Sequence, residues 1–437
     1  MFKKTTLQNG LRILTVPQKN AQAVTVLALV GTGSKYEKKE ENGISHFLEH
    51  MYFKGTKKRP SSMDVAETLD KVGGIYNAFT SEEYTGYFAK VAALHLELAL
   101  DWVSDIFLNS TLPEEEVEKE KGVIIEEINL HRDHPLSYVE ILWSRLLYGD
   151  QPAGWDIAGA KKSVAGMTRE KLIDYMKTQY AASNTIVSIA GNFDQSLVIQ
   201  KVQEYFSKIE TAKPIEKPKV IDAPIKPASA IGKAELIEEQ KEPNLLLRPR
   251  QTDQTHLCLG VRAFNIFHPK RYAQELLAVI LGGMMSSRLF EEIRSKLGIA
   301  YYINCSNEAN PDTGFIFAKA GLDNKNVEKG IFAILNEYKK ISQKKIPEKE
   351  LQKAKDYLKG KTTLLLESSD AQASFYAGQE LLEKKILTIE EIYDIIDKVT
   401  PDDIQTVAQT IFQPKNLNLA LIGPFKDKQQ FQKLLTI

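Results

Sequence analysis

The sequence predicts an α+β fold built from two structurally related halves that are joined by an extended linker. The first observation is the length of 437 residues, which exceeds the size at which a single hydrophobic core stops growing. The second is that runs with the period of a strand are interrupted by longer stretches with the period of a helix. The third is a pair of sequence echoes between the halves.

The echoes relate two segments of the first half to two of the second. Residues 86–90 (GYFAK) are echoed by residues 314–319 (GFIFAK), whose matching phenylalanines at 88 and 317 lie 229 positions apart. Residues 112–116 (LPEEE) are echoed by residues 346–350 (IPEKE), 234 positions further on. Because the two offsets nearly agree, we interpret the chain as an old duplication.

A segment rich in proline and lysine lies close to the middle of the chain. Residues 213–235 include prolines at 214, 218, 224 and 227 and show almost no amphipathic period, which is typical of an extended linker. We therefore predict one domain over 1–212, a linker over 213–235 and a second domain over 236–437.

The apolar period in the first half predicts its elements in order. Strands are expected at 11–16, 23–30, 76–79 and 84–91, and helices at 46–51, 62–72 and 95–107. The helix over 62–72 is expected to end at Gly73-Gly74, because glycine favours the backbone conformation that closes a helix.

Composition narrows the class of partner and compartment. Lys plus Arg and Asp plus Glu both number 57, so the formal net charge is zero, and we expect no nucleic-acid or membrane partner. Cys258 and Cys305 form no C-x-x-C pair, which favours a reducing compartment. The N-terminus lacks the apolar run of a secretory signal, and no stretch approaches the roughly 18 apolar residues of a membrane span. We expect a soluble, cytoplasmic protein.

The stretch His46-Phe-Leu-Glu49-His50 carries the strongest chemical signal in the chain. Positions three and four apart share one helix face, so His46, Glu49 and His50 project together. Two neutral imidazoles can bind zinc, and the carboxylate beside them can take a proton from an activated water. This order, H-x-x-E-H, is the inverzincin signature. We therefore predict one Zn²⁺ per chain.

A catalytic zinc site needs a third protein ligand. The segment after Pro113 contains a stripe at helical spacing, made of Val123, Ile124, Glu127, Ile128 and His131, which Glu120 extends backward. Glu126 falls on the polar side instead. Because a carboxylate within an apolar stripe is costly to bury unless it is paired, Glu127 is the better candidate, with Glu126 left open. Glu120 is predicted to accept a hydrogen bond from a ligating histidine.

These motifs resemble the pitrilysin family (M16) of zinc metallopeptidases. The resemblance rests on residues 43–56 (GISHFLEHMYFKGT), on the 77 residues from His50 to Glu127, and on Glu120 seven positions before Glu127. The resemblance covers nearly the whole chain. Within the family, the chain resembles the bacterial processing-protease type, which is similar to the mitochondrial processing peptidase beta subunit. The resemblance implies a zinc-binding catalytic domain over 1–212 and a homologous metal-free domain over 236–437.

The resemblance also implies residues that contact the substrate. Residues 73–80 (GGIYNAFT) resemble the strand along which the family lays its peptide, so Asn77, Ala78 and Phe79 are predicted to bind substrate by strand addition. Residues 287–301 resemble the family's Arg-x6-Tyr motif, which implies that Arg294 and Tyr301 assist catalysis by hydrogen bonds to the substrate carbonyl. As in the shorter members, a homodimer or a heterodimer with a related chain is expected.

The resulting hypothesis is a zinc-dependent endopeptidase that hydrolyses extended or unfolded peptides. His46, His50 and Glu127 hold the ion, and Glu49 is the general base for a zinc-activated water. The alternative is a non-catalytic scaffold or regulatory subunit of the same fold. Members of that kind typically lose part of the zinc set, whereas this chain retains it.

Overall fold

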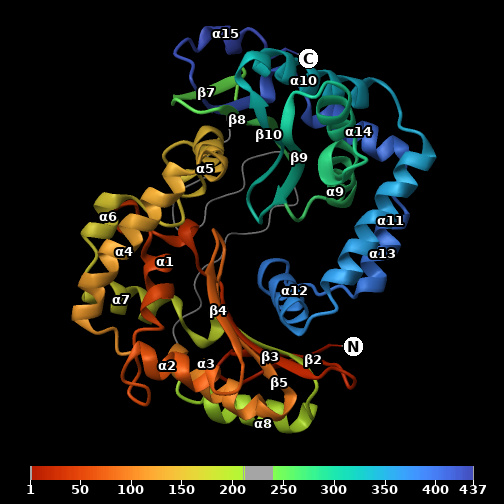
Figure 1. Cartoon of the computed structure of the whole chain (residues 1–437). Helices are drawn as coiled ribbons and strands as arrows, with labels where there is room; N and C mark the ends of the chain where they lie inside the picture. Colours follow the sequence, from red (N-terminus) through yellow and green to blue (C-terminus); the bar gives the residue numbers. More distant parts are fainter. Residues whose placement is uncertain (1, 210, 212–239, 437) are drawn as a thin grey trace. The chain divides into compact units, whose positions relative to one another are not determined.

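The computed structural model describes residues 2–209, 211 and 240–436, and it shows the expected α+β architecture (Figure 1). The chain divides into two compact units, each built on one mixed sheet. The predicted linker over 213–235 lies outside the described residues. Among the helices that the structure describes, none is both long enough and apolar enough to cross a membrane.

Unit 1 contains a six-stranded sheet in which only β2 and β6 run parallel. The strands, in spatial order, are β1 (Lys3–Thr6), β2 (Arg12–Pro17), β6 (Thr185–Gly191), β3 (Ala23–Val30), β5 (Thr85–Ala92) and β4 (Ile75–Thr80). The helices of this part of the chain are α1 (Ile44–Met51), α2 (Ser62–Asp70), α3 (Leu96–Asn109), α4 (Glu114–Asp133), α6 (Lys161–Ala165), α7 (Arg169–Gln179) and α8 (Gln195–Tyr205). All the strands and helices predicted for the first half are therefore confirmed, with shifts of a few residues at their ends.

Unit 2 contains a five-stranded sheet. Its strands, in spatial order, are β7 (Asn244–Pro249), β11 (Leu417–Gly423), β8 (Gln254–Arg262), β10 (Gly314–Asp323) and β9 (Ala300–Ala309). The helices of this part of the chain are α9 (Arg271–Ala278), α10 (Val327–Gln343), α11 (Glu348–Leu365), α13 (Ile389–Asp397), α14 (Pro401–Ile411) and α15 (Gln429–Gln432). Both echoes fall at matching places, because the first lies in β5 and β10 and the second runs into the first turn of α4 and of α11.

The two units exchange one helix-bearing segment each. The predicted domains, 1–212 and 236–437, are continuous in sequence, whereas Leu130–Gly154 belongs to unit 2 and Thr363–Leu387 to unit 1. The physical reason is burial. Strands β3 and β6 are buried along nearly their whole length, so the sheet needs an apolar cover on both faces.

The exchanged helices supply these second covers. In unit 1, α12 (Ser369–Leu382) packs on the side of the sheet that α1 and α3 leave open, where Tyr376 and Leu381 join a buried cluster with Leu27. In unit 2, α5 (Pro135–Tyr148) does the same, and Trp143 packs against Phe317 with ring centroids 5.3 Å apart. Each sheet is therefore the middle layer between two layers of helices (Figure 1).

An ion pair ties each exchanged helix to its sheet. Lys90 of β5 contacts Asp370 of α12 at 2.6 Å, and Lys319 of β10 contacts Glu140 of α5 at 2.5 Å. The two lysines are the last residues of the first sequence echo, 229 positions apart. The duplication therefore extends from the strands to the way in which each strand holds its covering helix.

Candidate metal centre

Helix α1 presents the H-x-x-E-H motif because its other face is buried. Ile44, Phe47, Leu48 and Met51 are fully buried in the core of unit 1. This leaves His46, Glu49 and His50 on the remaining face of the helix, as the spacing predicts. His46 is 9% exposed, and its ring meets that of His50 edge-on with centroids 4.7 Å apart.

Helix α4 brings a carboxylate to the two imidazoles. Glu127 Oε2 lies 3.6 Å from His46 Nε2 and 3.5 Å from His50 Nε2. These three residues can hold a metal ion, since one ligand atom from each lies within 4.8 Å of the others. In a tetrahedral zinc site with bonds of about 2.0–2.1 Å, neighbouring ligand atoms are roughly 3.3 Å apart. The two distances from Glu127 lie within a few tenths of an ångström of this spacing, so the three side chains can close around a zinc ion.

The structure places Glu126 and Glu127 differently. Glu126 is exposed, and only Glu127 joins the cluster. The predicted apolar stripe is partly wrong, however, because Val123 is 50% exposed and His131 is also exposed. The buried line of α4 runs through Val117, Glu120, Ile124 and Ile128, so Glu127 lies at its margin rather than at its centre.

Glu120 fixes the orientation of His50. Its carboxylate is 4% exposed, and its Oε2 lies 2.9 Å from His50 Nδ1 while Oε1 contacts Lys54 Nζ at 2.5 Å. An Nδ1–H that donates to Glu120 leaves the Nε2 lone pair directed at the cluster, which is the tautomer a metal needs. Lys54 is a residue that sequence reasoning missed.

The charges of the cluster are balanced for a cation. Burial disfavours the charged form of Glu120, but the hydrogen bonds from His50 and Lys54 outweigh this effect of burial and lower the pKa of Glu120. For His50, burial is likewise outweighed by Glu120 and Glu127, which raise its pKa to about 9. The two carboxylates thus attract positive charge to the position between the imidazoles, and a metal ion can replace the proton that His50 otherwise holds.

Glu49 is held beside the cluster by a second missed residue, Thr80. The hydroxyl of Thr80 donates to Glu49 Oε2 at 2.6 Å. Burial raises the pKa of Glu49 and the Thr80 hydrogen bond partly offsets this, so the carboxylate is a stronger base than an exposed one. Thr80 shares a strand face with Ala78 and Tyr76, which pack in the same core cluster as α1, and this tertiary contact has no signal in the sequence.

The predicted substrate strand is β4, the last strand of its sheet. It pairs with β5 on one side, and in the described part of the chain no strand pairs with its outer edge. Asn77 is exposed and Ala78 is buried, while the ring of Phe79 lies over Gly86 and meets Tyr84 edge-on. Phe79 therefore packs against its own sheet, and the role of Asn77, Ala78 and Phe79 in binding stays a prediction.

Arg294 and Tyr301 belong to unit 2, whereas the residues of the cluster belong to unit 1. The Arg294 guanidinium lies 4.9 Å from the centre of the Phe290 ring. Tyr301 is 73% exposed and lies at a β-bulge, since its neighbours Ala300 and Tyr302 pair with successive residues of β10. Bulges redirect side chains and are frequent beside active sites. The catalytic roles of Arg294 and Tyr301 stay predictions.

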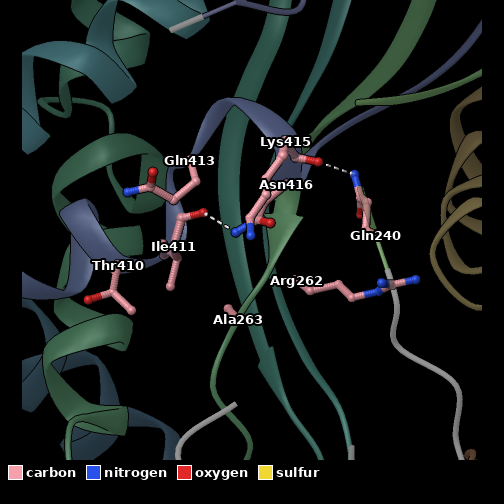
Figure 2. A pocket seen from close by; sticks show the side chains of 8 residues that line it. All are labelled: Gln240, Arg262, Ala263, Thr410, Ile411, Gln413, Lys415 and Asn416. Carbon is pink, nitrogen blue, oxygen red and sulfur yellow. Dashed lines mark hydrogen bonds between the residues drawn. The ribbon is translucent and has the colours of Figure 1, made fainter. Parts of the chain in front are cut away.

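A separate pocket of unit 2 contains none of the predicted site residues. It has a volume of about 470 Å³ and is lined by Gln240, Arg262, Ala263, Thr410, Ile411, Gln413, Lys415 and Asn416 (Figure 2). Several of its donors are already bound to backbone carbonyls: Gln240 to Lys415, Asn416 to Ile411 and Arg262 to Leu147. We therefore assign no function to this pocket.

Comparison with known proteins agrees with the geometry. The model of Insulinase (Peptidase family M16) matches residues 12–160, which include the whole metal cluster, and the model of the Peptidase M16 inactive domain matches residues 166–358. The chain belongs to peptidase family M16. The second match contains Arg294 and Tyr301 and no residue of the cluster, as the resemblance implies.

Relatives in this family share the full length of the chain. An uncharacterized zinc protease of Bacillus subtilis is 35% identical over 97% of this chain and 98% of its own, and one of Streptomyces coelicolor is 33% identical over 98% and 90%. A protease from Helicobacter pylori has the same fold, with a TM-score of 0.86, 23% identity and coverage of 97% and 99%. A chain of complex III2 from Candida albicans also has this fold, with a TM-score of 0.80, 19% identity and full coverage of both chains.

Proposed function

We propose that this M16 chain is a zinc-dependent endopeptidase that hydrolyses extended or unfolded peptides. The observation that carries the proposal is the cluster of His46, His50 and Glu127. The Glu49 carboxylate lies on α1 with the two histidines and is held there by the hydroxyl of Thr80. The zinc proteases among the full-length relatives support it. When bound, zinc would make a water more acidic and polarise the scissile carbonyl.

The protein side chains supply the proton transfers. Glu49 removes a proton from the attacking water, whose oxygen bonds to the carbonyl carbon of the peptide. Glu49 then gives this proton to the amine nitrogen as the C–N bond breaks, which leaves a carboxyl group on one product and an amine on the other. Thr80 occupies Oε2 of Glu49, so that Oε1 is the oxygen available for this proton. Glu120 holds His50 throughout, because its hydrogen bond fixes the ring independently of substrate.

The substrate class follows from the strand beside α1. Thr80, which holds Glu49, is the last residue of β4, so a peptide added to the outer edge of this strand lies beside the cluster. Only an extended segment can pair in this way, which makes folded proteins poor substrates. We further propose Arg294 and Tyr301 as contacts for the substrate carbonyl, and a second copy or a related chain as the partner.

The decisive experiment is Glu49→Gln. The amide keeps the size of the side chain but cannot accept the proton, so cleavage of a mixed peptide pool should fall by about 10²–10⁴-fold. Zinc, measured by mass spectrometry of the native protein, should stay at one per chain. Glu126→Gln is the matched control, because this exposed neighbour of the cluster should leave both readouts unchanged.

The same assay tests the scaffold alternative, which the likeness in fold to a chain of complex III2 favours. A wild-type chain that binds zinc but cleaves no peptide would support a scaffold. Cleavage retained by Glu49→Gln would instead refute the assignment of the base. Loss of zinc together with loss of cleavage in that variant would show that Glu49 acts on the metal ligands.

A further inference from the structure

Helix α1 has no N-terminal cap of its own. Its N-cap residue is Gly43, which has a φ of 97° and no side chain to accept a hydrogen bond from the first turn. The first backbone N–H groups of any helix need an acceptor from outside the helix. This requirement matters here because α1 has only eight residues and His46 is the third of them.

The missing acceptor is the carboxylate of Glu37, six residues before the N-cap. Its Oε2 accepts from Gly43 N at 2.7 Å and from Asn42 Nδ2 at 2.9 Å, and its Oε1 accepts from Ser45 N at 2.9 Å. Glu37 is only 6% exposed. Both oxygens of one buried carboxylate are thus occupied at the start of the metal-binding helix.

The surroundings leave this end of α1 little freedom. A Cβ built on Gly43 would lie 2.7 Å from the carbonyl oxygen of Ala158, so the start of α1 packs backbone to backbone against the segment that contains Ala158. The hydroxyl of Ser45 is 2.9 Å from that of Tyr175. The side chain of Glu37 joins the first turn to the loop that precedes the helix through its hydrogen bonds to Asn42, Gly43 and Ser45.

The charge of Glu37 is favoured by the helix rather than by a cation. Burial raises its pKa to about 7, and the hydrogen bonds from Gly43, Ser45 and Asn42 oppose this rise. A helix N-terminus carries a partial positive charge that stabilises an anion placed on its axis. The carboxylate and the first turn therefore stabilise each other, and loss of the acceptor oxygens weakens the first turn.

We propose that Glu37 is a positioning residue of the metal centre, which fixes the first turn of α1 and thereby holds His46 in place to bind the ion. The inference rests on the proposed function only in taking zinc as that ion. Groups that orient metal ligands typically contribute 10–100-fold to metal affinity. Glu37 lies one step further away, because it holds the backbone of Ser45 beside the ligand.

The test is the zinc affinity of Glu37→Gln, measured by competition with a chromophoric chelator at pH 8, where Glu37 is charged. The amide retains one acceptor oxygen but turns an NH₂ group towards a backbone N–H, so we expect the zinc Kd to rise about tenfold. Hydrogen exchange of the α1 amides should accelerate in the same variant, because the first turn loses an acceptor.

Asp105→Asn is the matched control. Asp105 is 5% exposed, and its three hydrogen bonds go to Thr56, Arg59 and Asn109, outside α1. It should lower the melting temperature about as much as Glu37→Gln while leaving the zinc Kd unchanged. Should Glu37→Gln not fold, Glu37→Asp, which shortens the side chain but keeps its charge, takes its place in the comparison.

Two results would overturn the inference. One is a zinc Kd that Glu37→Gln leaves unchanged, and the other is an equal increase in Glu37→Gln and Asp105→Asn, which would reveal general destabilisation. The affinity is measured without substrate. A wild-type chain that binds zinc but cuts no peptide therefore defeats the proposed function and leaves this comparison valid.

Discussion

Replacing Thr80 with valine separates the orientation of Glu49, the proposed general base, from the binding of the proposed metal ion. Valine has nearly the shape of threonine but cannot donate a hydrogen bond, so Glu49 Oε2 loses its 2.6 Å partner. No metal ligand is changed. We therefore expect one zinc per chain in the variant together with a changed dependence of cleavage on pH.

The magnitude follows from the bond that is lost. A hydrogen bond to a charged group contributes about 1.5–3 kcal/mol, and because Glu49 is only half-buried we take the lower end. Since 1.36 kcal/mol corresponds to one pKa unit, loss of the bond should raise the pKa of Glu49 by about one unit. Glu49 acts as a base only when it is deprotonated, so activity is lost as the pH falls through its pKa. The acid limb of kcat/KM should therefore move to higher pH by about one unit.

Thr85→Val provides the control. Thr85 stands directly opposite Thr80 in the β4–β5 ladder, is fully buried, and donates to the carbonyl of Thr32 instead of to Glu49. It should reduce stability without moving the acid limb. An acid limb that stays in place in Thr80→Val, or that moves equally in both variants, would refute the reasoning that Thr80 holds the base.

Two further predictions concern the third ligand and the exchanged helices. Glu127→Gln should weaken zinc binding by at least tenfold, measured by chelator competition, because it removes an anionic ligand. Glu126→Gln should leave zinc binding unchanged. If Glu126→Gln instead weakened zinc binding more than Glu127→Gln, Glu126 would be the ligand. A double-mutant cycle on Lys319→Met and Glu140→Gln, read as free energy of unfolding in urea, should give a coupling of about 1 kcal/mol, because Lys319 is buried but Glu140 is half-exposed. A coupling of zero would mean that α5 is held by its apolar contacts alone.

The part of the candidate metal centre that lies on α1 could be predicted from the sequence because helical periodicity is local. The spacing of His46, Glu49 and His50 sets their common face whatever surrounds the helix. The choice of Glu127 rested on a stripe that is only partly real, since Val123 is half-exposed. The carboxylate is not in the core of the stripe but at its edge, where it can reach the imidazoles of another helix.

The exchange of α5 and α12 could not be predicted because it depends on contacts across the whole chain. Helix α12 lies far along the chain from the strands that it covers, so local periodicity does not show which apolar surface it packs on. The need for a cover appears only once β3 and β6 are seen to be buried on both faces. The two matching lysines, Lys90 and Lys319, do contact the exchanged helices. Their partners, however, lie on opposite sides of them in the chain, since Asp370 follows Lys90 and Glu140 precedes Lys319, so the sequence offers no repeated pair to recognise.

Among the residues that support the candidate metal centre, pattern reasoning found Glu120 and missed Lys54, Thr80 and Glu37. Glu120 was predictable because it lies on the same helix as Glu127, at a helical spacing. Thr80 and Glu37 act on α1 from a strand and from a preceding loop, so only the tertiary fold brings them to Glu49 and to the helix N-terminus. Glu120, Thr80 and Glu37 each form a hydrogen bond with a proposed functional side chain or with the backbone beside one. Such bonds organise a metal centre before its ion binds. The chemistry of this chain is therefore as dependent on long-range folding as its core is, although its signature fits within five residues.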